Sequence, residues 1–258
     1  VGCHVRDPEH IEKAFDFGGM PARNGVTAAT MVAQGFSGVD DVFSGERNFF
    51  VAHGRPADPE RLVRGLGEEY EILRTNIKRW SVGSPIQAPL DALSVLLPFE
   101  ADEVEKVVVR VAHQGANTTN NRDMPDICMQ HLCAVMILDG TVSFKSSHDE
   151  KRMKDPAVLS MRKKITLAGD DALTRAMPSR QGIVEVFLQG ERKLRHHMKA
   201  VRGTAENPMT RAEVDAKGYD LMAPVLGRDR ARKLCDAIWN LDRLKDVRNL
   251  RTLLKEKR

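Results

Sequence analysis

Strand-like segments are confined to the middle of this chain, between two stretches with helical patterns. Residues 104–111 are rich in β-branched side chains, and residues 182–188 and 193–201 are patterned like the two arms of a hairpin. The first 50 residues and those after Met209 show helical periodicity instead. We therefore predict an α+β fold in which a helical domain is interrupted by a smaller α/β domain. The predicted boundaries are residues 1–69, 70–204 and 205–258.

Local signals predict several individual elements. Residues 126–139 form a strongly apolar helical run between Pro125 and Gly140. Thr210 and Glu213 have the spacing of a capping box, which predicts that a helix begins there. The other predicted elements are a small-residue helix ending at Gly35, a short helix at 37–45, a strand at 69–77, a loop at 113–123, a short helix at 156–163 and a strand at 164–167.

The stretch 76–97 contains the strongest candidate binding site. We predict that the strand at 69–77 ends in a tight loop carrying Lys78 and Arg79, and that a helix follows with Ser84 as its N-cap. Two cations and the amide groups of a helix start can together bind an anionic substrate. The alternative interpretation is that both cations belong to an ordinary solvated surface.

Charge and composition argue against several classes of function. The chain has 40 Lys and Arg residues against 36 Asp and Glu, a net charge of +4, and 5% aromatic residues. Neither value favours a nucleic-acid partner. No run of about 18 apolar residues and no signal-peptide pattern is present, so we expect no membrane association. The four cysteines form no CxxC pair, which favours a reducing, cytoplasmic location.

Six stretches, taken in order, resemble the MmgE/PrpD family, which includes 2-methylcitrate dehydratase, cis-aconitate decarboxylase and iminodisuccinate epimerase. One of them reads N-R-D-M-P-D-I-C-M-Q-H-L-C-A-V-M-I-L-D-G, and another reads R-G-T-A-E-N-P-M-T. The stretches that carry the resemblance are residues 25–50, 77–91, 121–140, 141–153, 202–210 and 239–250.

This resemblance implies a lyase or isomerase that acts on small polycarboxylates without a metal or another cofactor. Family members combine a large all-helical domain with a smaller α/β lid domain, hold the active site between the two, and form homodimers. The present chain is similar to the carboxyl-terminal part of the family only. We therefore expect its helical domain to be partial.

The resemblance also implies roles for particular residues. It makes Lys78 a pocket lysine at the start of the lid, where a desolvated ammonium group can bind a carboxylate or transfer a proton. Lys13 and Asp16 lie near a K-x-x-H-x-G motif of the family, with Asp16 in place of the histidine. Asp16 is a candidate base, and a helix-capping role is the alternative. Gly83 stands where the family often has Cys or His, which argues against the decarboxylase reaction.

The resemblance suggests the dehydration of a 2-methylcitrate-like hydroxy acid. Lys78 and Arg79 would stabilise the enediolate that forms when a proton is removed α to a carboxylate, and the loop at Ser84 would hold a carboxylate group. The acid and base would come from Lys13, Asp16 or the amino-terminal half of the family's helical domain, which this chain does not match. A second hypothesis is a non-catalytic fragment, or the carboxyl-side subunit of a split enzyme, that acts by binding its other half.

The histidines are weaker candidates for catalysis. His131 lies in the middle of an apolar helix, where a structural role is more common than a catalytic one. His148 and Asp149 are a candidate orienting pair in a loop, and only one of His196 and His197 can face inward on a strand. No set of His, Cys, Asp and Glu has metal-ligand spacing, so we expect no metal. The residues predicted to shape the junction between the domains are Arg202, Gly203 and Asn207.

Overall fold

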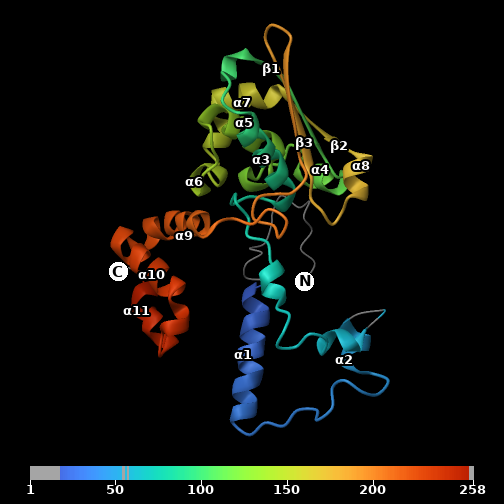
Figure 1. The fold of residues 1–258 in the computed structure, drawn as a ribbon, viewed down its shortest axis with the longest axis vertical. Helices are drawn as coiled ribbons and strands as arrows, with labels where there is room; N and C mark the ends of the chain where they lie inside the picture. Colours follow the sequence, from blue (N-terminus) through green and yellow to red (C-terminus); the bar gives the residue numbers. More distant parts are fainter. Residues whose placement is uncertain (1–17, 54–55, 57, 256–258) are drawn as a thin grey trace. The chain divides into compact units, whose positions relative to one another are not determined.

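The computed structural model describes residues 18–53, 56 and 58–255, which separate into two compact units (Figure 1). Unit 1 is Val1–Leu73 and unit 2 is Arg74–Arg258. Lys13 and Asp16 lie outside the described residues. No helix of the described part is both long and apolar enough to cross a membrane.

Unit 1 contains helices and loops but no buried residue among those described. Its helices are α1 (Met20–Ala33) and α2 (Phe49–His53), followed by a 3-10 turn at Pro59–Leu62. The predicted small-residue helix is therefore confirmed as α1, which ends just before Gly35. Many of its apolar side chains are exposed, including Val26 at 68%.

Unit 2 is built on a four-stranded sheet with the strand order β2-β1-β3-β4. Strands β1 (Val104–Val111) and β2 (Ile165–Gly169) are parallel, while β3 (Gly182–Leu188) is antiparallel to both β1 and β4 (Arg192–Met198). The predicted hairpin and both other strands of this region are confirmed. The mixed α/β fold class is confirmed as well.

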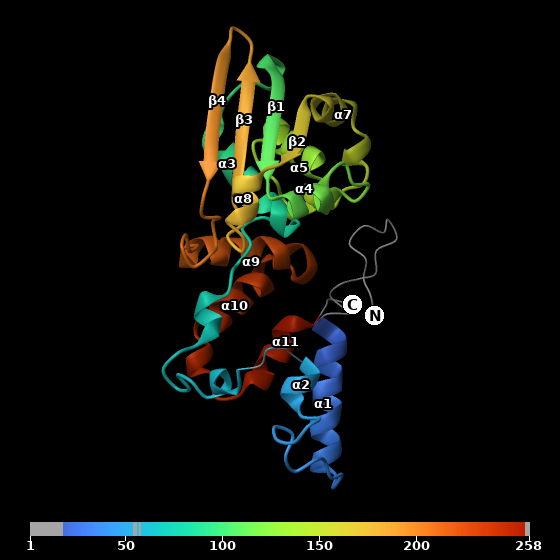
Figure 2. The same cartoon turned by 90° about the vertical axis from the view of Figure 1, so that its right-hand side faces the viewer.

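The core of unit 2 lies between one face of this sheet and the helices α3 (Gln87–Leu96), α5 (Met129–Asp139) and α7 (Pro156–Lys163). Figures 1 and 2 show these three helices on the same side of the strands. β1 alternates as expected for such a sheet, because Val107 and Val109 are fully buried while Val108 between them is partly exposed. Helix α5 is apolar on all sides and is buried over most of its length, which explains its sequence.

The last part of unit 2 is helical. Helix α9 (Arg211–Leu226) begins at the predicted capping box, in which Thr210 and Glu213 exchange hydrogen bonds. It is followed by α10 (Arg228–Trp239) and α11 (Arg251–Leu254), which share a small apolar cluster with α9. The remaining short helices of unit 2 are α4 (His113–Thr119), α6 (Phe144–Ser147) and α8 (Asp171–Arg175).

The predicted strand at 69–77 is wrong. A 3-10 turn, Glu71–Arg74, occupies its middle, and Ile72 and Leu73 are 78% and 80% exposed. The segment has apolar side chains but no neighbouring strand to pair with. At its end, the Ile77 amide donates a hydrogen bond to the Gly203 carbonyl at 2.8 Å.

Two other local predictions are also wrong. The segment 37–45 is not a helix, because the Asp41 carboxylate accepts hydrogen bonds from the amides of Phe43 and Ser44 and so stabilises a turn instead. The segment 113–123 is not a loop throughout, since α4 forms in its first half. The helix is stabilised by packing on β2 and by a hydrogen bond from the His113 amide to Thr174 Oγ1.

Candidate functional site

Gln87 fixes the loop that precedes α3. Its Oε1 accepts a hydrogen bond from the Trp80 amide at 3.1 Å, and its Nε2 donates to the carbonyls of Trp80 and Val82 at 2.8 and 3.2 Å. The side chain is 3% exposed, so these bonds are protected from water. Gln87 therefore holds residues 80–82 against the first turn of the helix.

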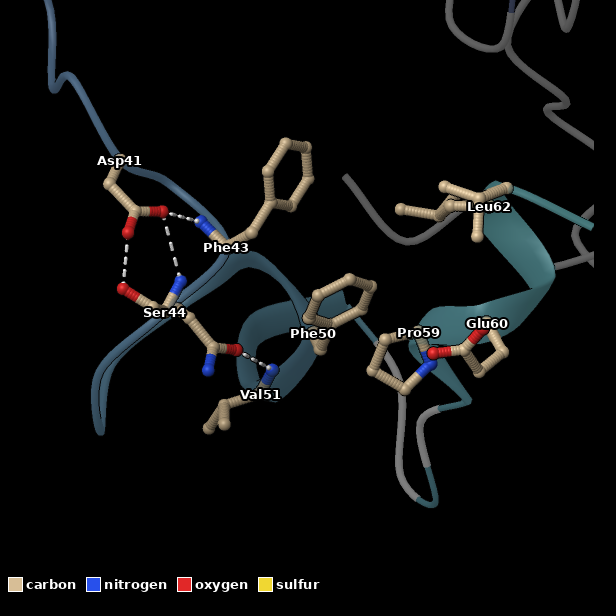
Figure 3. Close-up of a pocket in the computed structure, with 10 residues that line it drawn as sticks. Asp41, Phe43, Ser44, Phe50, Val51, Pro59, Glu60 and Leu62 are labelled. Atoms are coloured by element: carbon tan, nitrogen blue, oxygen red, sulfur yellow. Dashed lines mark hydrogen bonds between the residues drawn. The ribbon is translucent and has the colours of Figure 1, made fainter.

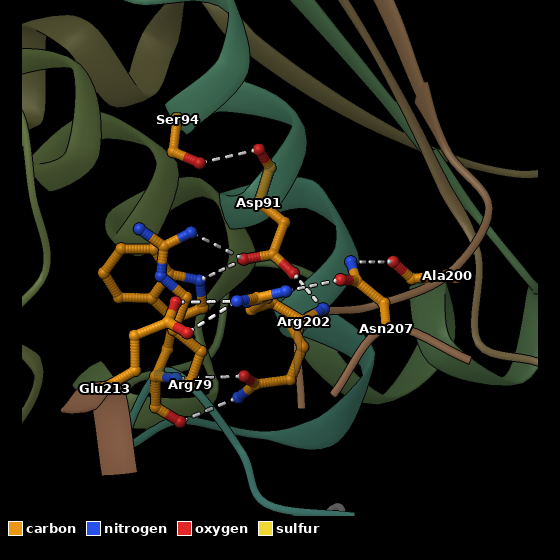
Figure 4. A network of polar contacts seen from close by, with 9 residues as sticks. Arg79, Asp91, Ser94, Ala200, Arg202, Asn207 and Glu213 are labelled. Atoms are coloured by element: carbon orange, nitrogen blue, oxygen red, sulfur yellow. Dashed lines mark hydrogen bonds and ion pairs between the residues drawn. The ribbon is translucent and has the colours of Figure 1, made fainter. Parts of the chain in front are cut away.

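A buried carboxylate one turn further along α3 connects this loop to a distant segment (Figure 4). Asp91 Oδ1 accepts from Trp80 Nε1 at 2.9 Å and lies 3.5 Å from an Arg79 nitrogen. Asp91 Oδ2 accepts from the Arg202 amide at 2.8 Å. Burial raises the pKa of Asp91, although these donors and the Arg79 charge oppose the rise.

Arg202 extends this network to α9, as Figure 4 also shows. Its guanidinium donates to both carboxylate oxygens of Glu213, at 3.1 and 2.5 Å, and to Asn207 Oδ1 at 2.8 Å. The bond from Arg202 and those from Thr210 hold the pKa of Glu213 down to about 2. The Arg202 charge is therefore paired with the Glu213 carboxylate at a partly exposed position.

Gly203 allows two chain segments to approach closely. Its φ is +97°, and a Cβ built on it would lie 1.8 Å from the Ile77 carbonyl oxygen. The two residues are joined by the hydrogen bond from the Ile77 amide to the Gly203 carbonyl. Residues 74–78 and 199–206 consequently lie side by side.

A pocket of about 710 Å³ lies between these segments, the start of α3 and the connection from α8 to β3. It carries five cationic side chains and one carboxylate, Glu206. Even with Arg202 paired with Glu213, cations outnumber the carboxylate in this lining, and such a charge balance favours a small anion. The residues that line the pocket are Arg74, Asn76, Ile77, Lys78, Ser84, Gln87, Ala176, Pro178, Ser179, Arg180, Lys199, Ala200, Val201, Arg202, Gly203, Thr204, Ala205 and Glu206.

The structure brings two of the predicted site residues together. Lys78 and Ser84 both line the pocket, and Lys78 Nζ donates to the Val82 carbonyl at 3.1 Å. Arg79 is directed elsewhere, because its guanidinium lies 4.4 Å from the centre of the Trp80 ring and close to Asp91. Ser84 begins a 3-10 turn, Ser84–Ile86, and does not cap it with its side chain.

The backbone amides of this helix start are largely used already. The Gly83 amide donates to the Asp126 carbonyl at 2.9 Å, the Ile86 amide to the Gly83 carbonyl, and the Gln87 amide to the Ser84 carbonyl. The prediction that the amides of the helix start are available to bind an anion is therefore wrong for Gly83, Ile86 and Gln87. The side-chain cations are therefore the main groups of the pocket that could bind an anion.

Sequence reasoning missed Lys217, a residue of α9 whose side chain contacts the loop that carries Lys78. Its Nζ donates to the Lys78 carbonyl oxygen. Burial and the nearby Lys78 charge lower the pKa of Lys217. The spacing of residues could have pointed to Lys217. Glu213 and Lys217 are four residues apart on a helix that the capping box predicts, so both lie on the same face of that helix. Asp91 had a signal as well, since it interrupts the apolar stripe of α3.

The histidines considered as candidates, His148 and His197 among them, do not line this pocket. The ring of His148 stacks on Phe144, and Asp149 accepts from the amides of Lys151 and Arg152 instead of pairing with His148. His197 Nε2 is 2.8 Å from Gln181 Oε1. Among the described residues, no group of three or more His, Cys, Asp and Glu could hold a metal ion.

His131 is fully buried on α5, and neither ring nitrogen has a hydrogen-bond partner. Burial, together with the charges of Arg162 and Arg152, lowers its pKa from 6.5 to about 4. The neutral ring is therefore the form that the fold accommodates. The contribution of the neutral His131 ring to the free energy of unfolding is complete above pH 6.5 and is lost as the pH falls toward 4.

Lowering the pH from 7 to 4.5 is expected to remove about 2.5 kcal/mol of unfolding free energy through His131 alone. This loss should disappear in His131→Leu, because the substituted side chain cannot take up a proton. Urea unfolding at both pH values measures the difference, with exposed His148→Gln as the control. Equal pH dependence in the wild type and His131→Leu would contradict the assignment.

Unit 1 has a separate hollow of about 1010 Å³ (Figure 3). It is bordered by apolar side chains such as Phe50 and Leu62 and by the carboxylates of Asp41 and Glu60. Phe43, Phe49 and Phe50 contact one another with ring centres 5.7–5.9 Å apart. Of the predicted site residues that the structure describes, Lys78, Arg79 and Ser84, none lines this hollow.

Unit 2 is thus a mixed α/β domain with a cation-lined pocket suited to a small anion. The family model for the MmgE/PrpD C-terminal domain matches residues 80–243, which is well over half of the chain. The chain belongs to the MmgE/PrpD family. Membership supports an MmgE/PrpD-type function in general, of the lyase or dehydratase kind. Among curated proteins, none matches the chain.

Proposed function

We propose that the protein is a metal-independent lyase for small polycarboxylates, and that it dehydrates a 2-methylcitrate-like hydroxy acid. The observation that carries this proposal is the pocket in which Lys78 and Ser84 meet several further cations. Family membership supports the reaction class. A substrate with two or three carboxylates would match both the size and the charge of the pocket.

Dehydration of such an acid requires removal of a proton α to a carboxylate, stabilisation of the resulting enediolate, and protonation of the departing hydroxide. The Lys78 ammonium would stabilise the enediolate, and Ser84 would hold a carboxylate. Arg79 would act through Trp80 and Asp91, which it contacts, by fixing the loop. Lys13 and Asp16 remain the proposed acid and base. Gly83 supplies no such group, so decarboxylation is not proposed.

The lid assignment is part of the proposal. Residues 70–204 would form the α/β lid, and residues 1–69 and 205–258 would belong to the helical domain. We also propose a cytoplasmic homodimer. Light scattering on the full chain tests the oligomeric state against the monomer mass of 28.8 kDa.

Lys78→Gln is expected to lower kcat/KM for 2-methylcitrate about 100-fold, because the amide keeps the size of the side chain but cannot neutralise the enediolate charge; this corresponds to about 2.7 kcal/mol. Alkene formation followed by ultraviolet absorbance is the measurement. Lys106→Gln removes an exposed lysine of β1 and is the matched control. Unchanged turnover in Lys78→Gln would refute the proposed role.

The second candidate function is that of a carboxyl-side subunit that acts by binding its other half. It is favoured by unit 1, in which no described residue is buried and apolar side chains such as Phe36 and Leu66 are 61% and 71% exposed. The same absorbance assay separates the two candidates. Turnover by the chain alone supports a self-sufficient lyase, whereas turnover only after addition of an amino-terminal half supports the subunit role.

A further inference from the structure

Two cations flank the open end of the β3–β4 hairpin, Arg180 just before β3 and Lys199 just after β4. The last residue pair of this hairpin is Gly182 with Met198. Continuing the antiparallel register places Gln181 opposite Lys199, and Arg180 directly before this pair. The hydrogen bond between the side chains of Gln181 and His197 shows that the two chains stay together at this end.

Both cations line the pocket that also contains Lys78 and Ser84. In the part of the chain that the structure describes, the side chains of Arg180 and Lys199 make neither an ion pair nor a hydrogen bond. The guanidinium of Arg202, by contrast, is neutralised by Glu213. Arg180 and Lys199 therefore offer uncompensated positive charge to the pocket.

The position of these two cations relative to the Lys78 loop is fixed by packing. A Cβ at Gly182 would lie 3.0 Å from Pro89 Cδ and 3.1 Å from Ala88 Cβ. Gly182 thus allows the start of β3 to approach the first turn of α3, the helix that follows Ser84. The hairpin end and the helix start form two walls at a set separation.

A carboxylate inside the pocket opposes this charge. Hydrogen bonds from its own amide and from Thr204 lower the pKa of Glu206, so the group is ionised at neutral pH. It would repel a substrate carboxylate that approached the segment 203–206. A ligand with two separated carboxylates therefore fits best with one near Lys78 and the other near the hairpin end.

We propose that Arg180 and Lys199 form a second carboxylate-binding pole, which selects dicarboxylates and tricarboxylates over monocarboxylates. This inference rests on the proposed function, because it assigns the far end of the same substrate. Arg180 can bind a carboxylate through two parallel N–H donors, and Lys199 adds a point charge to the same pocket. A pocket of about 710 Å³ has room for a small tricarboxylate between the two poles.

The test is calorimetric titration of the full chain with citrate, tricarballylate and propionate. The Arg180→Gln/Lys199→Gln double variant should bind the two tricarboxylates at least 10-fold more weakly than the wild type, with propionate affinity unchanged. Arg180→Lys should recover part of the loss. Arg175→Gln, an exposed cation of α8 outside the pocket lining, is the matched control. Equal urea midpoints establish that the variants are folded.

The same titrations distinguish a failure of the second pole from a failure of the proposed function. If Lys78→Gln weakens citrate binding while the double variant binds as tightly as the wild type, the second pole is refuted and the proposed function stands. If the wild type binds no tricarboxylate, both are refuted. A loss of affinity in the double variant that is equal for citrate and propionate also overturns the proposed selectivity.

Discussion

Asp91→Ala is expected to lower the free energy of unfolding by about 3–5 kcal/mol, because it removes one partner of a buried, charge-assisted network. The carboxylate is 1% exposed and accepts bonds from the Trp80 indole and the Arg202 amide. Alanine leaves both donors without a partner in a place that water does not reach. Arg79 loses its ion pair as well.

Urea unfolding followed by tryptophan fluorescence measures this effect, and Trp80 provides a local readout because its ring nitrogen bonds to Asp91. We expect a red shift of the native emission in addition to the lower midpoint. Asp102→Ala replaces an exposed carboxylate of the same unit and should cost less than about 0.5 kcal/mol. Asp91→Asn keeps an acceptor and should be intermediate. A loss below about 1 kcal/mol in Asp91→Ala would show that water replaces the carboxylate.

Elements with short-range signals were predictable from the sequence. Helix α7 has the predicted bounds, because Asp155 caps it and Pro156 occupies its first turn. Helix α5 ends at Gly140, which adopts a φ of +70° as a helix-terminating glycine does. Helix α9 begins at the capping box of Thr210 and Glu213. In each of these cases the determining contacts lie within a few residues of one another.

The wrong predictions concern segments whose structure depends on distant partners. The segment 69–77 contains apolar residues that give it strand character, but strand formation also requires a neighbouring edge, which the sheet does not offer there. Helix α4 has weak intrinsic propensity and forms because it packs on β2 and α8. Such packing cannot be read from a window of ten residues.

The residues of the candidate site also differ in how far the sequence predicts them. Lys78 and Ser84 could be proposed together because they are only six positions apart and a helix start was visible between Ser84 and Leu90. Arg180, Lys199 and Lys217 reach the same region from the segment before β3, the segment after β4 and α9, which are remote in sequence. Bringing them together requires the strand register and the close approach at Gly203, neither of which a single sequence reveals.

Gly203→Ala is expected to destabilise unit 2 by about 3–5 kcal/mol and to open the pocket. A methyl group cannot stand 1.8 Å from the Ile77 carbonyl oxygen, so the segments 74–78 and 199–206 must separate and lose the hydrogen bond between Ile77 and Gly203. The positive φ adds about 1–2 kcal/mol for any residue with a Cβ.

Gly190→Ala separates these two contributions, because Gly190 also has a positive φ, +71°, but no atom within 4 Å of the position that a Cβ would take. It should cost only the conformational part, about 1–2 kcal/mol. Urea unfolding gives both values, and citrate titration should show weaker binding in Gly203→Ala alone. Equal destabilisation in the two variants would mean that the contact with Ile77 relaxes at no cost. Weaker citrate binding in Gly203→Ala, measured at temperatures where the variant remains folded, would show that the pocket depends on the close contact between Gly203 and Ile77. Both segments that meet at this contact form walls of the pocket.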